Sequence, residues 1–448
     1  MKSRLRRKVM KVNVIGAGLA GCEAAWQIAS KGINVRLIEM KPKKFSPAHK
    51  SSGFAELVCS NSFKADRIDS AAGLLKGEMR LLDSLLLRCA KACRVPAGGA
   101  LAVDRDKFSE MVTNLIKEND FIEVVCNEVK EIPKDEITVV ATGPLTSDNL
   151  SENISSISNG LLSFYDAAAP IVTKDSIDME KAFFASRYDK GHDNSYINCP
   201  LNKEEYENFY NELILAERAP VHEFDVNDPK VYEGCMPVEV MAQRGKDTLR
   251  FGPMKPVGLI DPETGRRPWA VLQLRLENKE GTLYNLVGFQ TNLKFPEQKR
   301  IFGLIPALKN AEFVRYGVMH RNTFLNSPKI LNDDFSLKNN PNIFFAGQIT
   351  GVEGYMESAA SGILAGINAI KRLQNKSKFV LPEETMMGAL AHYISDSPAE
   401  DFQPMGANFG ILPKIEPHIR DKKARYNALS DRSINILKNI LNERSVEL

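Results

Sequence analysis

A glycine-rich turn between a short apolar strand and a helix constrains the fold of this chain more than any other feature. The turn follows the apolar run 12–15 and opens an alanine-rich helix expected over 22–30. Its first glycine permits a tight turn, its second lets the backbone approach a pyrophosphate, and its third allows helix and sheet to pack closely. The pattern predicts a dinucleotide-binding βαβ unit whose cofactor-binding turn consists of Gly16, Ala17, Gly18, Leu19, Ala20 and Gly21.

Three further segments complete the expected cofactor site. Glu39 ends the next strand, where its carboxylate can accept hydrogen bonds from a ribose. A buried strand over 137–141 leads to Gly143, and the apolar run 342–346 leads to Gly347 and Gln348. Their order, about two hundred residues apart, is similar to that of flavoproteins with two dinucleotide-binding domains. We therefore predict FAD as the bound cofactor. The sequence has no second glycine motif of this kind, so a reduced nicotinamide would dock only transiently.

The chain divides into a dinucleotide-binding pattern interrupted by a different one. Short β-like runs (271–276, 283–289, 312–318) and one acidic helix (203–217) fill the middle, whereas leucine-rich helical spacing (73–93) and a helix over 107–118 precede it. We predict an α/β fold with a Rossmann-like FAD-binding domain and an inserted α+β domain. The expected units are residues 1–165, residues 166–325, and residues 326–448, which include C-terminal helices over about 380–448.

Composition bounds the partners and the compartment. The 448 residues carry a net charge of +3, too small to indicate RNA binding by itself, and no apolar run is long enough to span a bilayer. We expect a cytoplasmic protein with no membrane contact, no metal and no stable protein partner. Seven cysteines without a CxxC pair indicate reduced thiols. Five of them are expected to be buried and inert: Cys22, Cys89, Cys93, Cys126 and Cys199.

The other two cysteines are candidates for catalysis. Cys59 follows a short apolar run and precedes polar residues, and Cys235 lies between a glycine and a proline-ended turn. A thiolate is a strong nucleophile, and the free N–H groups of a turn lower the pKa of a thiol. Polar and glycine-rich stretches of the middle region predict loops around a ligand, with His320 equally compatible with a structural role.

Many runs of the sequence resemble one family. They include PAHK, FAELVCSNSFKAD, GLLKGEMRLL, EGCMPVEVMAQRG, FGPMKPVGL and FFAGQITGVEGYMESAASGILAGINA. Over about residues 11–415 the chain resembles the folate-dependent tRNA (uracil-5-)-methyltransferases. The resemblance implies methylation at C5 of the T-loop uridine (position 54) in the T-arm of tRNA. It also implies FAD, NADH or NADPH as reductant, and methylenetetrahydrofolate as one-carbon donor.

The resemblance also implies roles for the two thiols. The cysteine pair of the family falls on Cys235, as nucleophile toward C6 of uracil, and on Cys59, as a second thiol beside the flavin. Two positions depart from the family pattern: Ala17 stands where the first motif often has Gly, and Asn292 stands where a His often follows the GFQT run. Gln348 stands where flavoproteins with two dinucleotide-binding domains usually carry Asp.

Three alternatives stay open at the level of the sequence. The same chemistry could act on a ribosomal RNA uridine, because a branch of the family does so. The chain could also be a flavin oxidoreductase acting on a small molecule, or a non-catalytic tRNA-binding protein that uses FAD structurally. Salt-dependent tRNA binding would argue against a small-molecule oxidoreductase. Loss of methyl transfer in Cys235→Ala would argue against a non-catalytic tRNA-binding protein.

Overall fold

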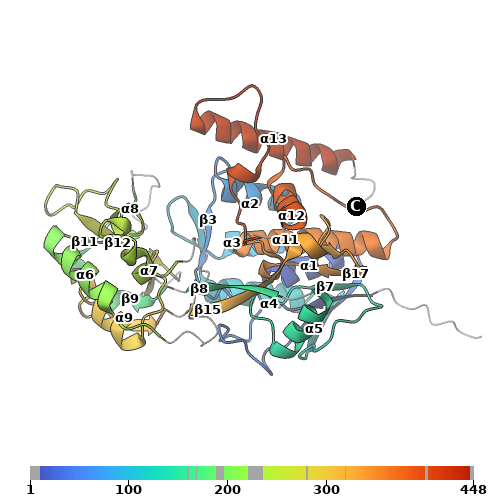
Figure 1. Cartoon of the computed structure of the whole chain (residues 1–448), viewed down its shortest axis with the longest axis horizontal. Helices are drawn as coiled ribbons and strands as arrows, with labels where there is room; N and C mark the ends of the chain where they lie inside the picture. Colours follow the sequence, from blue (N-terminus) through green and yellow to red (C-terminus); the bar gives the residue numbers. More distant parts are fainter. Residues whose placement is uncertain are drawn as a thin grey trace, which may run out of the picture.

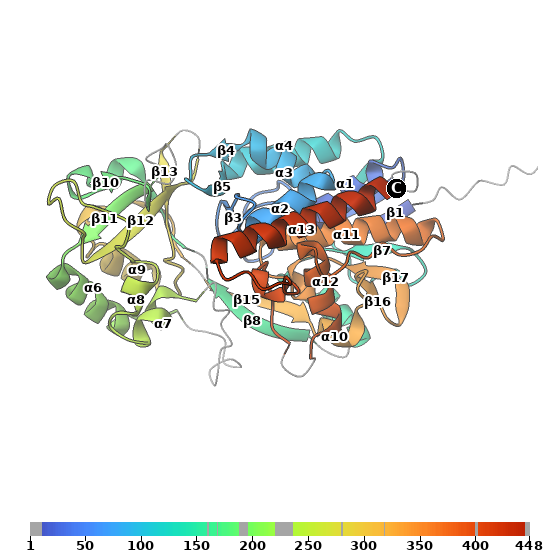
Figure 2. The ribbon, with the colours of Figure 1, turned by 90° about the horizontal axis from the view of Figure 1, so that it is seen from above.

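The computed structural model shows two lobes side by side (Figures 1 and 2). It describes residues 11–158, 161–167, 169–187, 196–219, 236–278, 281–317, 319–398 and 402–443, with the side chains of 161–167 and 319–321 left out. We call residues 169–317 the inserted lobe and the remaining described residues the dinucleotide lobe. Each lobe has its own hydrophobic core. Within the described ranges, no helix combines the length and the apolar character that crossing a membrane requires.

A six-stranded sheet in the order β16-β17-β7-β1-β2-β6 forms the centre of the dinucleotide lobe. Its strands β17, β7, β1, β2 and β6 are parallel, as expected for a chain that alternates strands with crossover helices. Near-continuous apolar runs make these strands, because both faces of a parallel sheet are covered. The strands are β1 (Lys11–Ile15), β2 (Asn34–Glu39), β6 (Ile122–Cys126), β7 (Thr138–Val140), β16 (Ser336–Leu337) and β17 (Asn340–Phe345).

Two helices of small residues cross closely against this sheet. They are α1 (Leu19–Ala29) and α11 (Tyr355–Leu373). A Cβ added to Gly362 would lie 2.2 Å from the Ala20 carbonyl oxygen, and one added to Gly366 would lie 2.9 Å from that of Ala24. The backbones can approach this far only because glycine occupies both positions.

The other helices of the lobe correct two expectations. The helical spacing over 73–93 is interrupted at Asp83, which has a φ of +54°, so two helices form instead of one. The C-terminal stretch is irregular over 402–408 and 412–421. The helices are α2 (Ala71–Leu81), α3 (Leu85–Ala92), α4 (Arg105–Lys117), α5 (Asp148–Ser158), α10 (Ser327–Ile330), α12 (Met386–Asp396) and α13 (Lys422–Glu443).

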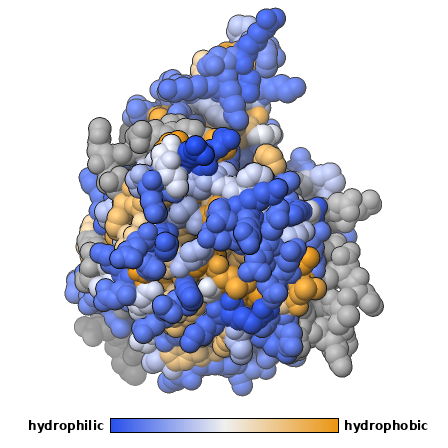
Figure 3. All heavy atoms as spheres, turned by 90° about the vertical axis from the view of Figure 1, so that its left-hand side faces the viewer, coloured by the Kyte–Doolittle hydropathy of each residue, from blue (hydrophilic) through white to orange (hydrophobic). Residues whose placement is uncertain are grey.

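An antiparallel sheet in the order β10-β11-β12-β13-β9-β14 forms the inserted lobe. The predicted acidic helix is α6 (Lys203–Leu215), which Asn202 and Glu205 start with a capping box. Seen end-on in Figure 3, the lobe is mostly polar, with apolar residues scattered between. Its other elements are β9 (Ile171–Thr173), β10 (Phe183–Phe184), β11 (Tyr196–Leu201), α7 (Val238–Gln243), α8 (Thr248–Phe251), β12 (Ala270–Leu276), β13 (Leu283–Leu286), α9 (Phe295–Phe302) and β14 (Phe313–Arg315).

Two small sheets connect the lobes. The antiparallel ribbon of β8 (Leu161–Ala167) and β15 (Met319–Leu325) carries the chain into and out of the inserted lobe (Figure 2). The predicted domain limits at 165 and 325 fall on this ribbon, and the division itself stays a prediction. A second sheet, β3 (Ser62–Ala65), β5 (Ala100–Val103) and β4 (Arg94–Val95), places Val95 and Ala102 in the core of the inserted lobe.

Buried Glu78 joins α2 to both C-terminal helices. Its carboxylate accepts the N–H groups of Met386 (2.6 Å) and Met387 (2.7 Å) at the start of α12, and the Ser433 hydroxyl of α13. Figure 1 shows α13 lying across α2. Burial raises the pKa of Glu78 to about 7, although these hydrogen bonds oppose the shift.

This carboxyl predicts a pH-dependent stability. Because its pKa is higher in the folded state than in the unfolded chain, the folded state binds more protons between pH ~4.5 and ~7. The free energy of unfolding should therefore fall as pH rises through this range, by on the order of 2–3 kcal/mol from Glu78. Urea unfolding at pH 5 and pH 7.5 measures this change in the free energy of unfolding. Glu78→Gln should flatten the dependence, whereas Glu110→Gln on the exposed face of α4 should not; equal slopes in both variants would refute the assignment.

Candidate functional site

The glycine turn lies at the carboxyl end of β1, between β1 and α1. Gly16 has a φ of +97°, and a Cβ there would lie 2.6 Å from the Ala141 carbonyl oxygen. A Cβ on Gly21 would lie 1.8 Å from the carbonyl oxygen of Gly16. In the part of the chain that the structure describes, in contrast, no atom lies within 4 Å of a Cβ added to Gly18, and no side chain caps the helix that begins after it. The outer glycines therefore serve packing, and Gly18 leaves open space at a helix N-terminus.

Glu39 closes the turn from the neighbouring strand. Its carboxylate accepts the N–H of Ala17 at 2.7 Å and that of Lys41 at 2.9 Å. The glutamate is buried at the end of β2, beside the start of α1. It is thus placed to orient both the turn and a hydroxyl-bearing ligand next to it.

One cavity brings the predicted cofactor residues together. Of the ten, nine line it, and only Gly21 does not, because it faces Gly16. The lining residues predicted from the sequence are Gly16, Ala17, Gly18, Leu19, Ala20, Glu39, Gly143, Gly347 and Gln348. A second, smaller cavity shares Gly16, Glu39 and Met40 with the first. The grouping agrees with one extended ligand, and the binding role of each residue stays a prediction.

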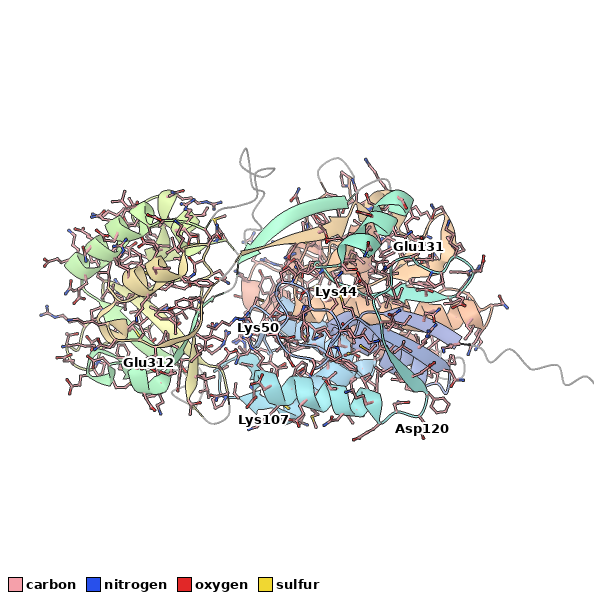
Figure 4. The ribbon with its side chains drawn as sticks, turned by 90° about the horizontal axis from the view of Figure 1, so that it is seen from below. Lys44, Lys50, Lys107, Asp120, Glu131 and Glu312 are labelled. Carbon is pink, nitrogen blue, oxygen red and sulfur yellow. The ribbon has the colours of Figure 1, made fainter. Side chains whose placement is uncertain are left out.

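A loop after β2 supplies lining residues that the sequence analysis did not select. Lys41 is buried, and its ammonium donates to the carbonyl oxygens of Ser51 (3.1 Å) and Gly53 (2.6 Å). His49 lies 2.6 Å from the Ser46 hydroxyl, and burial together with Lys41 lowers the pKa of its imidazole. Figure 4 shows Lys50, next to His49, at the side of the dinucleotide lobe that faces the inserted lobe. The signal for this loop was its place directly after Glu39.

The late turn shows how Gln348 is accommodated. Gly347 has a φ of +85° and donates its N–H to the Ser361 hydroxyl at 2.7 Å. The Gln348 amide donates to the Glu353 carboxylate at 2.6 Å. An acidic group is therefore present beside this position, five residues further along the chain, although the usual aspartate is absent.

Cys59 lies at the edge of the cavity, where its neighbour Val58 forms part of the wall. Its sulfur is 3.0 Å from the hydroxyl oxygen of Tyr355, the first residue of α11 and another lining residue. The N–H groups of Cys59 (2.8 Å) and Ser60 (3.2 Å) donate to the same oxygen. Tyr355 was missed from the sequence because it is 296 residues away from Cys59.

The remaining candidates have mixed outcomes. Cys235 lies outside the described residues, as does the side chain of His320. Asn292 is buried, its N–H donates to Glu239 at 2.8 Å and its amide donates to Ala219, so it has a structural role here.

Four of the five cysteines predicted to be inert are buried, and the prediction for the fifth is wrong in part. Cys22, Cys89, Cys93 and Cys199 are buried. Burial raises the pKa of the Cys89 thiol to about 12. Cys126 is only partly buried, because it lies at the end of β6, where its thiol donates to the Lys41 carbonyl.

The fold and the cavity define an FAD-binding α/β protein of the class with a Rossmann-like sheet and an inserted antiparallel domain. Among solved structures, GidA of Aquifex aeolicus has this architecture, with a TM-score of 0.68 over 96% of this chain and 73% of that one. At 16% identity this likeness establishes the fold alone. Residues 11–377 match the family model described as glucose inhibited division protein A.

Two curated relatives establish the family to which the chain belongs. Both are methylenetetrahydrofolate–tRNA-(uracil-5-)-methyltransferases named TrmFO. The protein of Acetivibrio thermocellus is 63% identical over 97% of this chain and 99% of its own length. That of Desulfitobacterium hafniense is 59% identical over 94% of this chain and 96% of its own. The chain belongs to the TrmFO family.

Proposed function

We propose that this protein methylates C5 of a uracil in tRNA with methylenetetrahydrofolate as the one-carbon donor, the reaction for which its relatives are named. The observation that carries the proposal is the position of Cys59, a partly exposed thiol at the edge of the dinucleotide cavity. A tRNA substrate implies a cytoplasmic site of action. The finer assignment, to the T-loop uridine with NADH or NADPH as reductant, follows the resemblance of the sequence.

The lining of the cavity fits FAD. Gly18 leaves room for a pyrophosphate where the uncapped N-terminus of α1 directs its N–H groups. Glu39 offers a buried carboxylate for the adenosine ribose, and Gly143, with a φ of +71°, also leaves open space. Gly347 and Gln348 would lie along the rest of the cofactor. Bound FAD supplies the reducing equivalents and carries the one-carbon unit.

The thiols address the difficulty of the substrate. C5 of uracil is not nucleophilic until the 5,6 double bond is converted into an enolate. A thiolate that adds to C6 forms a C–S bond and sends the electron pair of that double bond toward C5 and the O4 carbonyl. After C5 has acquired its carbon, a hydride derived from the reductant brings that carbon to the methyl level, and loss of the C5 proton and departure of the thiolate restore the double bond. We assign the addition to Cys235 and a supporting role to Cys59.

Mass spectrometry of RNA tests the function. The flavin-loaded protein is incubated with methylenetetrahydrofolate, NADH or NADPH, and equal amounts of a tRNA transcript and a ribosomal RNA fragment. We expect 5-methyluridine in the T loop of the tRNA and none in a transcript whose T-loop uridine is replaced by cytidine. Methylation of the ribosomal fragment alone would move the assignment to the other branch, and no methylated base at all would reject it.

Binding measurements separate an RNA enzyme from an oxidase of small molecules. Contacts with phosphates release counterions, so tRNA affinity should fall steeply between about 50 mM and 200 mM salt. Filter binding or fluorescence anisotropy with labelled tRNA measures this dependence. An affinity that is absent at low salt would favour the small-molecule alternative.

A further inference from the structure

Three arginines hold the loop that carries Cys59. Arg105 of α4 donates to the Leu57 carbonyl at 2.6 Å, and Arg315 of β14 donates to that of Val58. Arg275 of β12 donates to the Ser60 hydroxyl at 2.8 Å and to the Asn61 side-chain oxygen at 3.1 Å. Three elements from both lobes thus direct guanidinium groups at one short segment, residues 57–61, which we call the thiol loop.

The charge around the thiol loop is positive and poorly hydrated. Arg275 is 8% exposed, and the side chains of Arg105 and Glu277 are 13% and 4% exposed. Glu277 forms an ion pair with Arg105, so three cations and one anion leave a formal charge of +2. Charges interact more strongly where water is excluded, so this excess favours a negative group nearby. The other titratable groups facing the cluster are Tyr196, beside Arg275, and Tyr355.

The hydroxyl of Tyr355 has one direction left for its proton. A phenol oxygen accepts two hydrogen bonds and donates one. Both acceptor positions are used by the N–H groups of Cys59 and Ser60, and among the described residues the remaining hydrogen-bond partner is the Cys59 sulfur at 3.0 Å. Burial raises the pKa of Tyr355 well above its usual value, so the phenol keeps its proton. The hydroxyl therefore donates to the sulfur, and such a bond stabilises a thiolate more than a thiol.

We propose that Cys59 is held as a thiolate at neutral pH by the Tyr355 hydroxyl and by the positive charge of Arg105, Arg275 and Arg315. The proton of the thiol is lost to solvent. The three arginines act as positioning residues, because they contact the thiol loop and not the cavity. The inference deepens the proposed function by giving the second thiol a defined state, a nucleophile or base ready beside the cofactor.

Alkylation as a function of pH tests the proposal without RNA or folate. The flavin-loaded protein is treated with iodoacetamide from pH 5 to pH 10, and modification of Cys59 is followed by peptide mass spectrometry. We expect half-maximal reactivity well below the usual thiol pKa of about 8.5. Tyr355→Phe and Arg275→Met should each move it upward by about one unit, so that alkylation near pH 6.5 slows about tenfold. Arg275→Lys should keep most of the effect, because the charge remains.

Arg88→Met is the matched control, since Arg88 is an exposed arginine paired with Asp83 and should leave the profile unchanged. Thermal melting and flavin absorbance verify that each variant is folded. If Arg275→Met does not fold, the proposal is tested by Tyr355→Phe alone, because that variant removes only a single hydroxyl. A profile centred at or above pH 8.5, a Cys59 alkylated only after denaturation, or no shift in Tyr355→Phe would overturn the proposal. The readout is independent of methyl transfer, so its failure leaves the proposed function standing.

Discussion

Cys235→Ala is expected to abolish methyl transfer, with a fall of at least about 10³-fold in the rate of 5-methyluridine formation. Without the sulfur no adduct forms at C6, and C5 of the uracil stays unreactive toward an electrophilic carbon. Flavin content and tRNA affinity should change little, because the substitution removes one small side chain. The rate is measured by RNA mass spectrometry under single-turnover conditions.

Cys199→Ala is the matched control for this prediction. Cys199 is buried in β11 of the inserted lobe, where burial raises the pKa of its thiol far above the usual range. We expect this variant to keep its rate and to lose only a little stability. If Cys235→Ala retained more than about a tenth of the wild-type rate, Cys235 could not be the nucleophile. Cys59 would then be the next candidate, and the alkylation profile shows whether it is a thiolate.

Gly18→Asp should give a folded protein that binds FAD at least about 100-fold more weakly, because a carboxylate would occupy the place intended for the pyrophosphate. An added Cβ at Gly18 meets nothing within 4 Å, and its φ of −75° suits any residue, so the backbone has no reason to change. Flavin absorbance relative to protein, followed by titration of the stripped protein with FAD, measures the loss.

Two further glycine variants sharpen this test. Gly99→Asp adds the same carboxylate to another open position, outside the residues lining the cavity, and should keep its flavin. Gly21→Ala should instead fail to fold, since its Cβ would lie 1.8 Å from a backbone oxygen of Gly16. A yellow Gly18→Asp protein with unchanged affinity would mean that the pyrophosphate lies elsewhere.

The parts of the fold that local sequence determines were predictable. The glycine turn, the strand ending in Glu39, and the apolar strands around it depend on neighbours a few residues apart. Helix α4 starts near its predicted position because Asp104 caps it. The break at Asp83 was not predictable, because the leucine pattern continues through it. It depends on tertiary contacts, such as Gln27 donating to the Leu82 carbonyl and the Glu23 carboxylate accepting the N–H groups of Leu85 and Leu86.

The candidate site likewise contains residues that were predictable from a local motif and residues that were not. Residues of the glycine turns could be named from the sequence, because a single short motif carries their function. The contact of Tyr355 with Cys59 and the approach of Arg275 to Asn61 join positions 296 and 214 residues apart. Nothing in the local pattern of a tyrosine or an arginine distinguishes such a residue from one on the surface. These long-range contacts exist only after both lobes have packed.

The thiol loop has a consequence for how substrates reach the cofactor. Asn61 donates hydrogen bonds to the Leu276 and Glu277 carbonyls of the inserted lobe. Arg275 and Arg315 of that lobe donate hydrogen bonds to the thiol loop. Rotating the lobes apart would break these hydrogen bonds together, and each one that involves a guanidinium group contributes roughly 1.5–3 kcal/mol. We therefore expect the two lobes to keep a fixed relative arrangement during the reaction, so that a nucleotide must swing out of its own loop to reach the cofactor.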